Sequence, residues 1–117
     1  TNKIILDAYN ANPSSMKLAI ENFARFHTSG KVLMLGGMAE LGEESLAEHK
    51  DIINVIKKDE WSKVVLVGGD FLRVEHPFIS FQNAEEAKEW FRKQHFENMH
   101  ILIKGSRSMK MEKILEP

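Results

Sequence analysis

The 117-residue sequence contains no cysteine, and this absence excludes several kinds of chemistry. Without thiols there is no disulfide framework, no thiolate nucleophile and no cysteine-ligated metal site. No apolar run approaches the roughly 20 residues that a membrane-spanning helix needs, and no signal peptide precedes the first apolar segment. We therefore expect a cytoplasmic protein without a membrane partner.

A bias in charge is missing as well, because the formal net charge is −1. A nearly neutral chain has no global field that would attract nucleic acid or an anionic membrane. The five histidines show no paired i, i+4 spacing and no accompanying cluster of metal ligands. We therefore expect no nucleic-acid partner and no metal site built from this chain alone.

Two common nucleotide-binding signatures are also absent. A phosphate loop needs two glycines at a fixed spacing, followed by lysine and then serine or threonine. Gly37 and Gly42 have that spacing, but Glu43 stands where the lysine is required. The dinucleotide-binding pattern Gly-x-Gly-x-x-Gly follows none of the predicted strands. The chain therefore lacks the part of an enzyme that grips a triphosphate.

The sequence does contain an alternation of short apolar runs with segments of helical periodicity. The apolar runs predict strands at 3–6, 32–35, 63–67, 78–81 and 100–103, of which the first two are expected to be buried. The periodic segments predict helices at 14–27, 45–58, 84–94 and 109–115. Asn12 before Pro13, and Asn83 before Glu86, are typical helix starts. This alternation predicts an α/β, Rossmann-like three-layer sandwich with a mostly parallel sheet, formed by residues 1–117 as a single domain.

Small or polar residues follow four of the predicted strands. They are Asn10 and Asn12, Gly36 and Gly37, Gly68 and Gly69, and Gly105 and Ser106. The carboxyl ends of parallel strands meet at one edge of the sheet, where open α/β sheets bind their ligands, so these residues predict a ligand site. Alternatively, the glycines merely make tight turns between strands and helices.

Several charged residues near these strand ends are candidate site residues. Lys104-Gly-Ser-Arg107 combines two cations with a hydroxyl and a flexible backbone, which suits a carboxylate or phosphate, although both cations could simply be solvated. Asp7 could hydrogen-bond a ribose diol or brace its own loop. His49 lies on the apolar face of its helix, as a hydrogen-bonded core histidine would. Glu40 is a functional candidate in a strand-end loop, or a charge that favours the following helix N-terminus.

Three motifs make the sequence similar to a known family. Asp7-Ala-Tyr-Asn-Ala-Asn-Pro-Ser-Ser-Met16, Leu35-Gly-Gly-Met-Ala-Glu-Leu-Gly42 and Lys104-Gly-Ser-Arg-Ser-Met-Lys-Met-Glu112 resemble the C-terminal domain of Mur ligases. Within that family, they are most similar to the members that add D-alanyl-D-alanine. Gly37 stands where the family usually has Asp, and Leu6 where some members have a second Asp.

The resemblance implies a cytoplasmic three-domain enzyme of peptidoglycan synthesis, of which this chain is the C-terminal lid. The abrupt start on Thr1, without an initiator Met, agrees with a domain excised from it. The implied reaction joins UDP-N-acetylmuramoyl-tripeptide to D-alanyl-D-alanine through an acyl phosphate and uses ATP and Mg2+, which are held mainly by the central domain. The implied enzyme is a monomer, and the isolated lid is expected to be inactive.

The resemblance also implies roles for individual residues. Asp7 would hold the ribose, and Tyr9, Asn10 and Asn12 would line the nucleotide side of the closed cleft. Lys104, Ser106 and Arg107 would face the incoming dipeptide or stabilise the charged intermediate, and Glu40 and His49 would contact substrate in the same pocket. No residue is assigned as a catalyst. The alternatives are another amino-acid ligase of the same superfamily and a non-enzymatic α/β module that binds a nucleotide or acidic ligand.

Overall fold

Five strands form one parallel sheet in the computed structural model, which describes all of residues 1–117. They are β1 (Lys3–Asp7), β2 (Lys31–Gly36), β3 (Lys63–Val67), β4 (Ile79–Phe81) and β5 (His100–Lys104). Their order across the sheet is β1-β5-β2-β3-β4, and every neighbouring pair is parallel. The predicted α/β class and parallel sheet are confirmed. None of the helices is long and apolar enough to cross a membrane.

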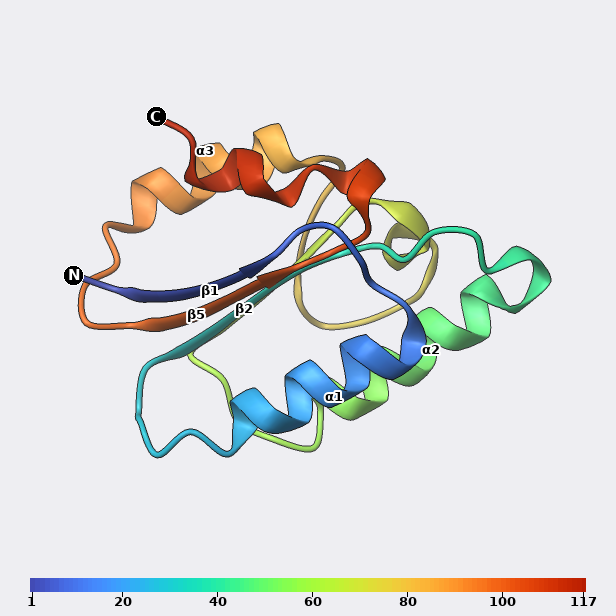
Figure 1. Ribbon diagram of the computed structural model, residues 1–117, viewed down its shortest axis with the longest axis horizontal. Helices are drawn as coiled ribbons and strands as arrows, with labels where there is room; N and C mark the ends of the chain where they lie inside the picture. Colours follow the sequence, from blue (N-terminus) through green and yellow to red (C-terminus); the bar gives the residue numbers. More distant parts are fainter.

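Helical segments cover both faces of this sheet and complete three layers (Figure 1). On one face lie α1 (Pro13–Ala24) and α2 (Ser45–Ile56); on the other lie α3 (Ala84–Gln94) and the short 3-10 turns η3 (Arg107–Met109) and η4 (Met111–Leu115). Two further 3-10 turns, η1 (Gly42–Glu44) and η2 (Gly69–Arg73), come after β2 and β3. The short helix expected at 109–115 consists of 3-10 turns, which are interrupted at Lys110 by a left-handed φ of 52°.

The central strand β2 shows why the apolar runs are continuous. Leu33 and Leu35 belong to the hydrophobic cluster under α1 and α2, whereas Val32 and Met34 belong to the cluster under α3 and η4. Because successive side chains of a strand point to opposite faces, a strand covered on both faces must be apolar at every position. The sheet therefore separates two cores, and its carboxyl edge is left free for loops.

The starts of two helices agree with the sequence. The Asn12 side chain accepts the backbone N–H of Ser15 at 2.8 Å, and the Ser15 hydroxyl accepts the backbone N–H of Asn12 at 3.1 Å. Pro13 occupies the first turn, where a missing N–H costs nothing. The Asn83 side chain caps α3 by accepting the N–H of Glu86. Both predicted caps are confirmed, and the first of them anchors the end of the loop that follows β1.

The prediction that segment 3–6 is buried is wrong. Ile4, Ile5 and Leu6 are 40%, 42% and 44% exposed, because β1 lies at the edge of the sheet and pairs with β5 alone. The run is as apolar as that of a central strand, so its composition did not distinguish the two positions. The edge position of β1 follows from the order of strands, which depends on contacts between distant segments of the chain.

Two paired residues provide a test of this edge position. Leu6 and Ile103 are neighbours across the β1–β5 pair, and Ile103 is fully buried. We expect Ile103→Ala to lower the free energy of unfolding by about 3 kcal/mol, as for a buried aliphatic side chain, and Leu6→Ala by only about 1 kcal/mol. Urea unfolding of the two variants measures the difference. Equal losses would contradict the exposed position of β1.

Candidate functional site

A pocket of about 480 Å3 opens at the carboxyl edge of the sheet, where the segments after β1, β2 and β5 meet. These segments leave the sheet at the right of Figure 1. We call it the rim pocket, and its lining consists of Tyr9, Asn10, Ala11, Ala39, Glu40, Ser106, Arg107, Ser108 and Lys110. The predicted convergence is confirmed for three of the four strand ends, since the segment after β3 contributes no lining residue.

The glycines at the strand ends hold backbones in contact and do not line the pocket. A Cβ atom on Gly37 would lie 2.8 Å from the Cα of Gly69, and one on Gly105 would lie 3.0 Å from the Cα of Gly36. Gly69 also has a φ of 56°, which favours glycine. Gly69 thus makes a turn, as the alternative expected, whereas Gly37 and Gly105 lie at close approaches between two backbones. Their close approach brings the ends of β2, β3 and β5 together beneath the pocket.

The Lys104 side chain is buried, although the sequence suggested that it faces a substrate. It is 3% exposed, and its Nζ donates to Oδ2 of Asp7 at 2.6 Å and to the backbone carbonyl of Asn10 at 2.8 Å. Asp7 and Lys104 are register partners at the ends of β1 and β5, so the ion pair joins the ends of these two strands next to the rim pocket. Neither residue lines the pocket.

The Asp7 carboxylate is held in its charged form. The hydrogen bond from the Lys104 side chain keeps the pKa of Asp7 below its ordinary value of 3.8; partial burial opposes this shift, and the charge of Lys104 reinforces it. Hydrogen bonds from the backbone of Tyr9 and Asn10 act in the same direction. This geometry agrees with the alternative in which Asp7 braces its own loop. The Asp7 side chain is 46% exposed and so stays accessible to a ligand. The ribose contact stays a prediction.

His49 is fully buried, as the core alternative expected, and does not reach the rim pocket. Its Nε2 lies 2.9 Å from the backbone N–H of Met38 and must accept that hydrogen bond. The ring proton therefore resides on Nδ1, which donates to the carbonyl of Ser45 at 2.7 Å. The ring also packs edge-on against Phe71, with centroids 4.7 Å apart. The imidazole joins the loop after β2 to the first turn of α2.

Five of the nine residues assigned to the site line the rim pocket and four do not. Those that line it are Tyr9, Asn10, Glu40, Ser106 and Arg107. Those that do not are Asp7, Asn12, His49 and Lys104. Asn12 is instead occupied as the cap of α1. The four residues outside the pocket share one feature: the polar side chain of each already binds other atoms of the chain.

Two polar lining residues, Ser108 and Lys110, received no role from the sequence. Lys110 lies three residues after Arg107, and the 3-10 turn between them brings both cations to the same pocket. The separation of three residues between Arg107 and Lys110 is visible in the sequence. It places the two side chains close together only if the segment forms a 3-10 turn. Arg107 and Lys110 are exposed and form no ion pair within the chain, so the pocket offers two free cations beside one carboxylate, Glu40.

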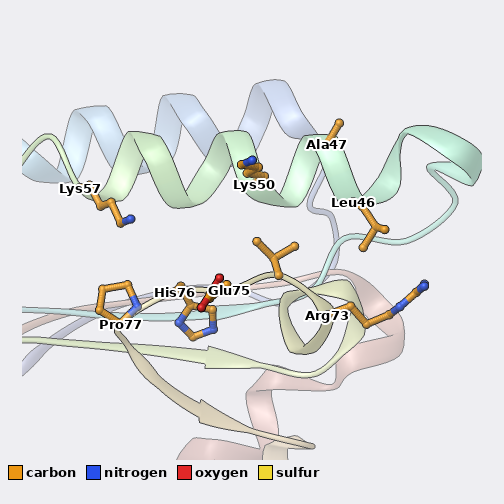
Figure 2. A pocket seen from close by; sticks show the side chains of 9 residues that line it. Leu46, Ala47, Lys50, Lys57, Arg73, Glu75, His76 and Pro77 are labelled. Atoms are coloured by element: carbon orange, nitrogen blue, oxygen red, sulfur yellow. The ribbon is translucent and has the colours of Figure 1, made fainter.

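A larger cavity, of about 780 Å3, lies elsewhere, between α2 and segment 73–77 (Figure 2). Lys50, Lys57 and Arg73 border it, and all three are exposed. The imidazole of His76 in its wall already accepts the backbone N–H of Phe78 through Nδ1 and lies 3.0 Å from the Ser80 hydroxyl through Nε2. None of the predicted site residues lines this cavity. The rim pocket is therefore the candidate site.

Comparison with known proteins points to one family. Residues 1–107 match the family model described as Mur ligase, glutamate ligase domain. The chain is 36% identical over 121 residues to the UDP-N-acetylmuramoyl-tripeptide–D-alanyl-D-alanine ligase of Buchnera aphidicola, covering 98% of the chain and 26% of that protein. The ligase of the same name from Rickettsia prowazekii is 34% identical, with 97% and 27% covered. The chain thus spans about a quarter of the length of these relatives.

Solved structures agree with this match. A MurF structure from Acinetobacter baumannii has a TM-score of 0.78 at 31% identity, covering 96% of the chain and 26% of that protein. The MurF ligase of Thermotoga maritima, solved in complex with ADP, has a TM-score of 0.80 at 24% identity, with 96% and 26% covered. At that identity the second likeness shows the fold alone.

Proposed function

The chain belongs to the Mur ligase family, and from this premise we propose that it is the C-terminal domain of a three-domain cytoplasmic enzyme. The proposed enzyme is a monomer that joins UDP-N-acetylmuramoyl-tripeptide to D-alanyl-D-alanine in peptidoglycan synthesis. Relatives that bear this name match 97% or more of the chain and are roughly four times its length, which supports a parent enzyme with further domains. The isolated domain is proposed to be inactive.

The proposed reaction has two steps. The tripeptide carboxylate first takes the terminal phosphoryl group of ATP, and the dipeptide amine then displaces phosphate from the acyl phosphate to give an amide. No group of three or more His, Asp or Glu side chains in this chain is placed to hold a metal ion, so Mg2+ and the triphosphate are assigned to the central domain. This domain would contribute recognition, orientation and exclusion of water, which protects an acyl phosphate from hydrolysis.

The observation that carries this proposal is the pair of free cations in the rim pocket. Arg107 and Lys110 have no anionic partner within the chain, and Ser106 adds a hydroxyl next to them. Fixed cationic donors suit the dipeptide carboxylate or the negative charge that develops during acyl transfer. Glu40, also in the lining, suits the dipeptide ammonium before it loses its proton. Tyr9 and Asn10 would face the nucleotide.

Removal of one of these cations tests the proposal. In the full-length enzyme, we expect Arg107→Ala to lower kcat/KM for D-alanyl-D-alanine by about a hundredfold, because a fixed donor to developing charge is lost. ADP release, measured with the dipeptide as the varied substrate, gives this value. Arg92→Ala is the matched control, since Arg92 is an exposed arginine of α3 paired only with Glu89. Unchanged turnover in Arg107→Ala would contradict the proposal.

A second candidate function is ligation of a different amine. The matching family model is described by its glutamate ligase domain, and this description does not specify D-alanyl-D-alanine. A panel of amino acids and D-alanyl-D-alanine, offered to the full-length enzyme, separates the two candidates. A titration of ATP into the isolated chain tests the non-enzymatic alternative, because a lid is expected to bind ATP very weakly and a free-standing nucleotide-binding module tightly.

A further inference from the structure

The shape of the rim pocket depends on what holds its loops. Two loops line it: segment 8–12, which follows β1, and segment 37–41, which follows β2. Strand β5 lies between β1 and β2 in the sheet, and the residues that follow it also line the pocket. Both loops carry a main-chain atom that is bound by a buried side chain from outside the loop. These two side chains, Lys104 and His49, are two of the five for which the resemblance implied a contact with substrate.

Lys104 binds the main chain of the first loop, segment 8–12. Its side chain is 3% exposed, and the ammonium group donates both to Asp7, at the end of β1, and to the carbonyl of Asn10. Charge-assisted hydrogen bonds in a buried site are strong, and this one sits next to the lining residues Tyr9 and Ala11. The ammonium has its partners within the chain, and the nearly complete burial of the side chain leaves little surface for a substrate anion.

His49 holds the second loop in the same way. Nε2 accepts the N–H of Met38, and Nδ1 donates to Ser45, so both ring nitrogens are used by main-chain groups. Met38 lies two residues before Glu40, which projects into the pocket from a backbone with a left-handed φ of 60°. A non-glycine residue in that conformation needs its surroundings to maintain it. The imidazole anchors the chain just before it.

We infer that Lys104 and His49 are positioning residues: each fixes one loop of the rim pocket through a main-chain hydrogen bond, and neither touches substrate. The part of this inference that concerns substrate rests on the proposed function, whereas the part that concerns the loops does not. Preorganised loops spare the enzyme the cost of ordering them when it binds substrate. Each residue therefore acts on catalysis through the backbone of one loop.

Amide hydrogen exchange on this chain tests the structural part. We expect Lys104→Met to accelerate exchange of the amides of 9–11 by about tenfold and to leave 38–40 unchanged, and His49→Phe to do the reverse. Each variant is thereby the control for the other. Equal acceleration in both loops by either variant would overturn the inference, because a general loss of stability raises exchange throughout the fold. A variant that accelerated exchange in neither loop would overturn it as well.

Conservative variants keep the test decisive if either substitution prevents folding. Lys104→Arg retains a donor to Asp7 and Asn10, and His49→Gln retains an acceptor for the N–H of Met38. Both are expected to keep the exchange rates of their loops within about threefold of the wild type. A tenfold acceleration in either of these variants would show that the main-chain hydrogen bond is not what holds the loop, and would overturn the inference.

Kinetics of the full-length enzyme test the part that concerns substrate. If Lys104 acted through a substrate carboxylate, Lys104→Met would weaken the use of D-alanyl-D-alanine much more than that of its C-terminal amide. We expect instead that kcat/KM falls about tenfold for both, so that their ratio stays unchanged. A ratio altered tenfold would overturn the inference. If the wild-type enzyme uses neither dipeptide, the proposed function fails, while the exchange experiment still decides the role of the loops.

Discussion

Gly37→Ala is expected to lower the free energy of unfolding by about 3 kcal/mol, because the added Cβ atom has no room. It would lie 2.8 Å from the Cα of Gly69 and 3.1 Å from the carbonyl oxygen of Gly68, and both are backbone atoms. Relief would require the ends of β2 and β3 to separate, which would also disturb the loops above them. Chemical denaturation, followed by circular dichroism, measures the loss.

Gly30→Ala is the matched control for this prediction. A Cβ atom on Gly30 would meet Sδ of Met99 at 2.7 Å, which is as close as the contact at Gly37. The neighbour here is the end of a flexible side chain, which can move to another rotamer, so we expect a loss of about 1 kcal/mol or less. Losses of the same size in Gly30→Ala and Gly37→Ala would contradict a backbone clash at Gly37.

The resemblance described above implies an Asp at the position of Gly37 in other family members. An Asp at this position would bring the same Cβ into contact with Gly69 and would place a carboxylate near the carbonyl of Gly68. In this chain we therefore expect Gly37→Asp to be at least as destabilising as Gly37→Ala.

Asp7→Ala is expected to destabilise the fold by about 3 kcal/mol, whereas Lys104→Met is expected to cost only about 1 kcal/mol. The difference follows from burial. Loss of Asp7 leaves the ammonium of a lysine side chain that is only 3% exposed with one carbonyl as partner. Loss of Lys104 leaves the carboxylate of a side chain that is 46% exposed, which water can solvate. The double variant Asp7→Ala/Lys104→Met should be more stable than Asp7→Ala alone. A double variant less stable than either single one would contradict this account.

The same pair predicts how stability depends on pH. The Lys104 hydrogen bond lowers the pKa of Asp7 in the folded chain below the ordinary value of 3.8 that it has when unfolded. The stabilisation is therefore complete above about pH 5 and is lost as the pH falls through the folded pKa. Between about pH 4 and pH 2, the wild type should lose stability more steeply than Lys104→Met or Asp7→Ala. Urea midpoints measured across this range provide the comparison.

The candidate site could be predicted in part from the sequence. The residues after the first and last strands were recognisable as loop residues at one edge, and Tyr9, Asn10, Ser106 and Arg107 do line the rim pocket. The roles suggested for Lys104 and His49 depended on whether each side chain faces the pocket or the interior. Residue type gives no answer, because a lysine or a histidine can bind a substrate or a main-chain carbonyl equally well.

By itself, the sequence determined the features that depend on near neighbours in the chain. The helix starts at Asn12 and Asn83, the five strands and their parallel arrangement follow from capping, periodicity and the alternation of elements. Only the tertiary structure decided that β1 lies at an edge, that Lys104 and His49 are buried, and that Lys110 joins Arg107. These outcomes depend on contacts between residues far apart in the chain, such as those between Asp7 and Lys104, and no local pattern encodes such contacts.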